Sequence, residues 1–116
     1  MVPEPPEWDN FLKADAAFFA SQGGDVNIGA HLPEIFAKAG LEVIDVTPTT
    51  KYGRPGNAEW QWLTTYFLGV LPRMAACRPF SPAQAASLKR FWITAGREKT
   101  SLLISPTVLD VVGRKA

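Results

Sequence analysis

Residues 28–47, with the sequence IGAHLPEIFAKAGLEVIDVT, decide the fold because they change from a helical to a strand pattern at one glycine. Apolar residues of the first half recur at helical spacing: Ile28, Leu32, Ile35 and Phe36. This spacing predicts an amphipathic helix that ends at Gly40, with capping side chains in residues 25–27 before it. Residues 41–47 are a β-rich run of strand length, which Pro48 is expected to close.

The amino-terminal side of this stretch predicts one more helix. Three prolines among the first six residues cannot continue a helix interior or a strand ladder, so residues 1–6 are expected to form an extended lead-in. Large apolar residues then recur mostly at spacings of three, four and seven: Trp8, Phe11, Leu12, Phe18 and Phe19. This pattern predicts a helix over residues 7–21 that ends at the Gly23-Gly24 pair.

The carboxy-terminal side predicts a loop and two further helices. Residues 52–57 contain two glycines and a proline, a composition typical of a loop. Helical spacing then extends over 58–76, where Pro72 is expected to kink or interrupt the helix. The string Ser81-Pro82-Ala83-Gln84 offers a hydroxyl cap, a proline at the first helical position and a glutamine that can bond back to the cap. It predicts a helix over 82–95.

The carboxy-terminal residues predict strands whose apolar faces the rest of this chain is not expected to cover. Residues 102–104 and 107–112 are strand-like, and 113–115 form a polar ending. Four residues make the last strand apolar on both faces: Val108, Leu109, Val111 and Val112. Such a strand is typical of the interior of a larger layered sheet, whereas an isolated two-stranded ribbon is only marginally stable. We therefore expect another segment or chain to cover it.

Composition narrows the class of protein. A chain of 116 residues has the length of one domain, so residues 1–116 are expected to form a single α/β domain. With 47% hydrophobic and 20% charged residues, the mixture is typical of soluble globular proteins. The formal net charge is +1 without runs of like charge, which gives no reason to expect nucleic acid or an acidic membrane as partner.

Cysteine and histidine usage narrows the chemistry. A single Cys and a single His exclude an internal disulfide and a metal site of the usual kind. The amino terminus lacks a secretory-signal pattern, and no stretch approaches the roughly 18 apolar residues of a membrane span. By elimination, we expect a cytoplasmic location.

Several strings, in this order, resemble the carboxy-terminal half of a class I S-adenosylmethionine-dependent methyltransferase. They are Gly23-Gly24-Asp25, Ile28-Gly29, Leu32-Pro33, Ala39-Gly40-Leu41, Trp60, Trp62-Leu63, Ser105-Pro106 and Val111-Val112-Gly113-Arg114. The resemblance covers about residues 5–115. It implies a partial Rossmann-like fold with about four helices and a short antiparallel strand pair, in which the final antiparallel strand completes a seven-stranded sheet. It also implies S-adenosylmethionine as the cofactor of a full-length enzyme and a small organic molecule as the methyl acceptor.

The motifs that hold the methyl donor in this family are absent from the sequence. The family uses a glycine-rich turn after its first strand and an acidic residue at the end of the second. Residues 23–29 contain glycines but follow a predicted helix, so we assign no cofactor-binding residue to this chain. The family often has a basic residue after Ile-Gly, whereas this chain has Ala30 and His31, which leaves an anion contact there in doubt.

The predicted helix over residues 58–76, which corresponds to an insertion in the resembled family, carries the candidate substrate residues. Trp60, with Leu63 and Phe67, forms one helical face, and Trp62 and Tyr66 form a second. In the resembled family this insertion covers the acceptor pocket as a lid, so Trp60, Trp62 and Tyr66 are candidate substrate contacts. Packing in the protein core remains an equally supported role for them.

Other reactive side chains have plainer explanations. His31 is a weak candidate for a catalytic base, because histidine is the residue type that most often serves as a base near neutral pH, but an exposed histidine on a helix face explains it more simply. Asp25 is better explained by capping, and Cys77 beside Arg78 lacks a placed base. Lys51, Arg54 and Arg73 could meet an anionic substrate, although scattered surface cations are common.

These observations favour a methyltransferase carboxy-terminal region that supplies a sheet edge and a substrate lid and is inactive alone. Its partner would be the missing amino-terminal half. The alternative is a non-catalytic module that binds a small ligand or forms a homodimer through its last strand. A third interpretation is a carrier of apolar ligands that uses the Trp-rich helix.

Overall fold

The computed structural model describes residues 1–76 and 80–116. Its elements are, in order, α1 (Trp8–Ser21), α2 (Ile28–Lys38), β1 (Leu41–Thr49), β2 (Tyr52–Gly53), α3 (Ala58–Met74), α4 (Pro82–Ala95), β3 (Leu103–Ile104) and β4 (Val108–Lys115). The described part therefore contains four helices and two small antiparallel sheets, which confirms the predicted mixed α/β class. The Cα radius of gyration is 16.8 Å, whereas a compact domain of this length has about 13 Å. The molecule is elongated, at 51 × 32 × 19 Å.

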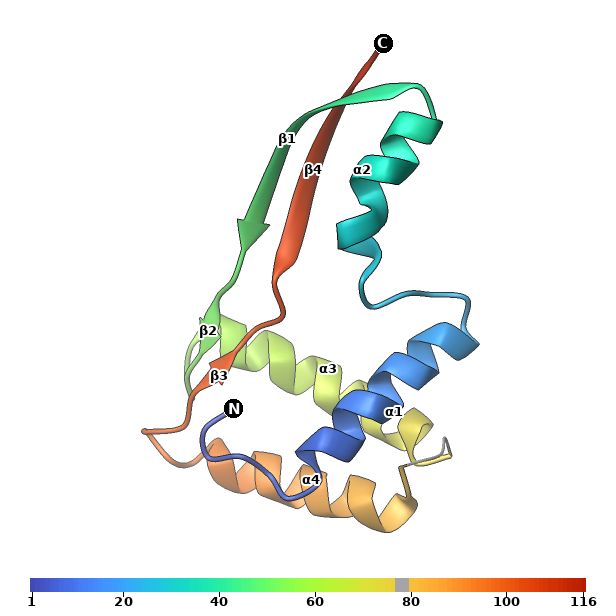
Figure 1. Cartoon of the computed structure of the whole chain (residues 1–116). Coiled ribbons are helices and arrows are strands. Elements are labelled where there is room, and N and C mark those ends of the chain that lie inside the picture. The colour runs from blue at the N-terminus through green and yellow to red at the C-terminus, as the bar shows by residue number, and fades with distance from the viewer. Residues whose placement is uncertain (77–79) are drawn as a thin grey trace.

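Helices α1, α3 and α4 form what we call the helical body, which holds the protein core (Figure 1). Trp60 of α3 stacks on Trp92 of α4 with ring centroids 4.7 Å apart, and Phe67 lies 4.4 Å from the same indole. Phe11 of α1 completes the aromatic cluster at 4.9 Å from Phe67. The inward positions therefore follow the helical spacing of the sequence.

The start of α4 has the predicted capping box. Ser81 accepts a hydrogen bond from the backbone of Gln84, and the Gln84 side chain accepts one from the backbone of Ser81. Helix α3 runs past Pro72 to Met74 without the predicted interruption. Pro72 has no N–H to donate to the carbonyl four residues before it, and the helix ends two residues later.

Strands β1 and β4 pair antiparallel, with Leu41 opposite Lys115 and Thr49 opposite Val108. Helix α2 lies against both strands, and Figure 1 shows that these three elements project away from the helical body. We call them the arm. A Cβ added to Gly113 would come within 2.7 Å of the Phe36 ring, and a Cβ added to Gly29 would touch Leu109. The two glycines thus allow close contact between α2 and the ribbon.

The arm contributes no residue to the protein core. Every residue of α2, β1 and β4 is at least partly exposed. Because side chains alternate along a strand, the contacts of Leu109 and Gly113 place Val108, Asp110 and Val112 on the opposite face, away from α2. Val108 and Val112 are 51% and 47% exposed. Within this chain the last strand is therefore covered on one face only, and not on both as its apolar pattern predicted.

Three boundaries differ from the prediction. Strand β1 continues through Pro48 to Thr49, because a strand at a sheet edge tolerates a proline. Strand β4 includes residues 113–115, which pair with the start of β1. The short strand β2 lies within the predicted loop 52–57 and pairs with β3.

The amino-terminal lead-in is attached to the body, since Val2 forms an isolated bridge with Leu102. Among residues 1–76 and 80–116, no helix is both long and apolar enough to cross a membrane.

Candidate functional site

An open depression of about 410 Å³ lies where the arm joins the helical body. It is lined by residues from β1 and the linker after it, from the start of α3, and from β4 and the linker before it: Thr49, Lys51, Ala58, Glu59, Trp62, Ser105, Val108 and Asp110. The depression is thus at the carboxyl end of β1 and on the ribbon face that α2 leaves uncovered. Its volume falls within the range of small-molecule sites.

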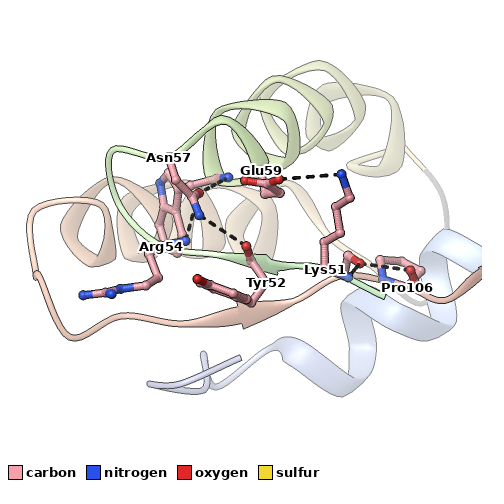
Figure 2. A network of polar contacts seen from close by, with 8 residues as sticks. Lys51, Tyr52, Arg54, Asn57, Glu59 and Pro106 are labelled. Carbon is pink, nitrogen blue, oxygen red and sulfur yellow. Dashed lines mark hydrogen bonds and ion pairs between the residues drawn. The ribbon is translucent and has the colours of Figure 1, made fainter. Parts of the chain in front are cut away.

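Asn57 fixes the start of α3 beside this depression. Its side-chain oxygen accepts hydrogen bonds from the backbone N–H groups of Trp60 (2.9 Å) and Arg54 (3.0 Å). Its amide nitrogen donates to the carbonyl of Tyr52 at 3.3 Å, as Figure 2 shows. One side chain therefore caps α3 and holds the 52–57 loop against it. Gly53 permits this approach, because an added Cβ would lie 3.1 Å from the backbone nitrogen of Trp60.

A second set of hydrogen bonds joins the two linkers between the arm and the body. The backbone N–H of Lys51 donates to the Ser105 hydroxyl oxygen at 2.9 Å, and the Ser105 N–H donates to the Lys51 carbonyl at 2.8 Å. The Ser105 hydroxyl in turn donates to the Pro106 carbonyl. Ser105 is only 8% exposed, so these bonds satisfy a buried polar group and hold the floor of the depression.

The charged groups of the depression are two carboxylates and one ammonium. Lys51 Nζ lies 3.9 Å from Glu59 Oε1, a long ion pair that Figure 2 shows beside the Asn57 cap. The carboxylate of Asp110 has no hydrogen bond or ion pair with any other residue in the described ranges 1–76 and 80–116. The lining therefore carries an excess negative charge, located on β4.

The three predicted substrate residues lie in different surroundings. Trp62 is 56% exposed and lines the depression. Trp60 is buried in the core against Trp92, and Tyr66 donates a hydrogen bond to Asp15 on the side of α3 that faces α1. Burial, together with the Asp15 carboxylate, raises the pKa of the Tyr66 hydroxyl well above its usual value. Only Trp62 is thus placed to meet a molecule in this depression.

His31 lies on the exposed surface of α2, away from the depression. Its Nε2 is 3.9 Å from Asp25 Oδ2, and both side chains are about half exposed. Asp25 accepts a hydrogen bond from the Asn27 N–H at 2.8 Å, so it caps the turn before α2 and not the helix itself. The weak catalytic candidate therefore has one solvated carboxylate beside it. Cys77 and Arg78 lie outside the described residues.

The glycine-containing turn at residues 23–29 follows a helix and bonds several of its own N–H groups. Gly23 and Gly24 follow α1, and their N–H groups donate to the carbonyls of Ala20 and Phe19. The Asn27 N–H donates to the Asp25 carboxylate. A nucleotide-binding loop presents free backbone N–H groups to its ligand, whereas these three are already bonded within the chain. Within the described ranges, no group of three or more His, Cys, Asp or Glu side chains is suited to a metal ion.

Sequence reasoning did not single out Thr49, Glu59, Ser105 or Asp110 as members of a site. The alternation of β4 could have placed Val108 and Asp110 on one face, and helical spacing could have placed Glu59 beside Trp62. The face of the ribbon and the face of α3 come close together because of the linkers at residues 50–51 and 105–107. The sequence of these linkers does not predict this arrangement.

Comparison with known proteins identified no relative of this chain. A scan against protein-family models, a search of curated proteins and a search of solved structures all found no match. The functional argument therefore depends on the residues of this chain.

Proposed function

We propose that this chain is the carboxy-terminal region of a class I S-adenosylmethionine-dependent methyltransferase, and that it supplies a sheet edge and a lid over the pocket of a small organic acceptor. One observation carries the proposal: the arm is half of a layered structure. It has two strands, a helix on one face and no buried residue. A ribbon of this kind is marginal alone and stable as part of a larger sheet with both faces covered.

Strand β1 has the features of a true sheet edge. Pro48 lies within it, and proline is confined to edge strands because it cannot donate a ladder hydrogen bond. The β1–β4 register also shifts between Val43 and Asp45, and bulges of this kind protect sheet edges. Strand β4 has no proline, so its unpaired side is the side on which further strands would add.

The position of the helical body suits a lid. In open α/β sheets, ligands bind at the carboxyl ends of the parallel strands. The depression lies at the carboxyl end of β1, and Trp62 enters it from the α3 side. An acceptor bound there would lie between the sheet edge and the helical body.

The other properties that the resemblance implies belong to this proposal. The donor site and the rest of a Rossmann-like sheet would come from an amino-terminal half, because the glycine-containing turn at residues 23–29 follows a helix and not a strand. A cytoplasmic location is also part of the proposal.

The test combines calorimetry with hydrogen exchange on the purified chain. We expect S-adenosylmethionine to give no saturable heat, and we expect the amides of α2 and β4 to exchange much faster than those of α3 and α4. Saturable binding of S-adenosylmethionine would contradict a donor site outside this chain. Strong protection of β4 in a monomer would contradict an incomplete sheet.

A self-pairing module is the second candidate, because β4 carries charges of both signs, Asp110 and Arg114, of which Arg114 already pairs with Glu42 of β1 at 2.8 Å. If two copies pair antiparallel with Val112 on the two-fold axis, Asp110 of each copy faces Arg114 of the other on the same sheet face. With strands about 4.8 Å apart, the two α2 helices would lie about 10 Å apart, a normal helix-packing distance.

The mass in solution separates the two candidates. A dimer that R114D dissociates and the charge swap D110R/R114D restores would favour the module. A monomer would remove it and leave the methyltransferase proposal in place.

A further inference from the structure

We propose that the depression at the joint of arm and body binds an organic cation, an ammonium group on a small apolar or aromatic molecule. The inference rests on the proposed function in one respect: in the complete enzyme, the methyl acceptor would bind here as this cation. The binding itself is a property of the described residues.

The charge balance of the depression favours a cation. Lys51 and Glu59 face each other at 3.9 Å and largely neutralise one another. This leaves Asp110, whose carboxylate has no partner among residues 1–76 and 80–116. It lies on the same ribbon face as Val108, which gives the floor an apolar surface beside the charge.

An exposed indole lies opposite this charge. Trp62 is 56% exposed, whereas Trp60 and Trp92 are 6% and 2% exposed, so α3 presents one tryptophan to the depression and buries the other. Glu59 is three residues before Trp62, which places its carboxylate and the indole on one side of α3. A cation close to an indole face is attracted by the ring quadrupole, and tryptophan is the best of the aromatic side chains for this contact.

The same surroundings disfavour an anion. Among the described lining residues, the ammonium of Lys51 is the single cation, and it already faces Glu59. At the start of α3, the Trp60 N–H already donates to the Asn57 side chain. An anion would therefore meet two carboxylates and one ammonium that is already paired.

The size of the depression determines which small molecules are suitable for a binding experiment. A depression of about 410 Å³ accommodates a molecule with one ring and a short side chain. Phenethylamine provides an ammonium group on such a body. The alcohol 2-phenylethanol has nearly the same shape without charge, and 3-phenylpropionate places a carboxylate on a similar body.

The experiment follows the indole N–H signals of the intact chain by NMR during titration with these three compounds. The variant W62F identifies the Trp62 signal and replaces the indole with a smaller aromatic ring. We expect phenethylamine to shift this signal saturably and to bind roughly three- to tenfold more tightly than the alcohol, as a cation–π contact with a nearby carboxylate would give. The carboxylate compound should give no saturable shift.

Two exposed carboxylates provide a matched pair of variants. D110N removes the unpaired charge of the depression and should weaken phenethylamine binding by roughly threefold. D9N changes the chain's charge by the same amount on the exposed surface of α1 and should leave binding unchanged. Both side chains are exposed, so neither change should affect folding, and the far-ultraviolet circular dichroism of each variant checks this.

The inference is overturned if 3-phenylpropionate binds as well as phenethylamine, if none of the three compounds shifts the Trp62 signal, or if D110N and D9N behave alike. These outcomes do not depend on whether the sheet is incomplete. Cation binding by a monomeric chain whose β4 is strongly protected would keep this site and remove the methyltransferase proposal. If the arm exchanges fast and the chain binds no cation, the methyltransferase proposal stays and this site is removed.

Discussion

Replacing Gly113 with alanine should detach α2 from the ribbon without unfolding the helical body. The new Cβ would lie 2.7 Å from Phe36 Cδ2 and 2.9 Å from Cε2, whereas carbon atoms normally approach to about 3.5–4.0 Å. Overlap of this size typically costs about 1–3 kcal/mol. Phe36 is partly exposed and can move, so we expect a cost of about 1–2 kcal/mol, which corresponds to amide exchange in α2 that is roughly five- to thirtyfold faster.

Hydrogen exchange with mass spectrometry measures this effect segment by segment. In an F36A background the same G113A change should add no further cost, because the obstructing ring is gone. G69A is the control, since its Cβ meets nothing within 4 Å and an alanine there should stabilise α3 by about 0.5–1 kcal/mol. Unchanged exchange in α2 would refute the Phe36–Gly113 contact. Equal acceleration in α4 would show that arm and body unfold as one unit.

Three further predictions concern the helical body. T64V should destabilise the chain by about 1–3 kcal/mol more than T65V in urea titrations, because both hydroxyls bond a carbonyl of α3 but only Thr64 accepts from the buried indole of Trp92. N57A should cost about 1 kcal/mol in thermal melts, and N57D should cost less because it keeps the accepted bonds at the α3 cap. Burial and a carboxylate partner raise the pKa of Tyr66, so its contribution is complete below about pH 10 and is lost as the pH rises above this value. Y66F should therefore flatten the alkaline limb of a Tm-versus-pH curve.

The elements with local signals were predicted well. Helix α4 has the predicted bounds of 82–95, because a capping box and a glycine stop define both its ends within the sequence itself. Strand β1 was predicted two residues short, since Pro48 looks like a terminator until its place at a sheet edge is known. Strand β3 lies within the predicted strand-like residues 102–104, whereas its partner β2 was missed because a two-residue strand depends on tertiary contacts and has no pattern of its own.

The candidate site was only partly accessible from the sequence. Two faces of α3 were evident from spacing, and the structure assigns Trp60 to the core and Trp62 to the surface. The spacing could not tell which face was which, because both carry aromatic residues. Asp110 was missed for a different reason: a carboxylate in a strand is ordinary until a second element comes near it.

The depression should persist even if the arm is loosely held in the isolated chain. Its floor and rim are held by bonds within the linkers and at the start of α3: the Lys51–Ser105 backbone pair and the Asn57 cap. Neither set involves the contact between α2 and the ribbon. Of the lining residues, Thr49, Val108 and Asp110 belong to the arm, and all three lie within a few residues of the Lys51–Ser105 bonds, where the ribbon is anchored to the body. Opening of the arm should therefore begin at its far end, around Leu41 and Lys115, and reach the depression last.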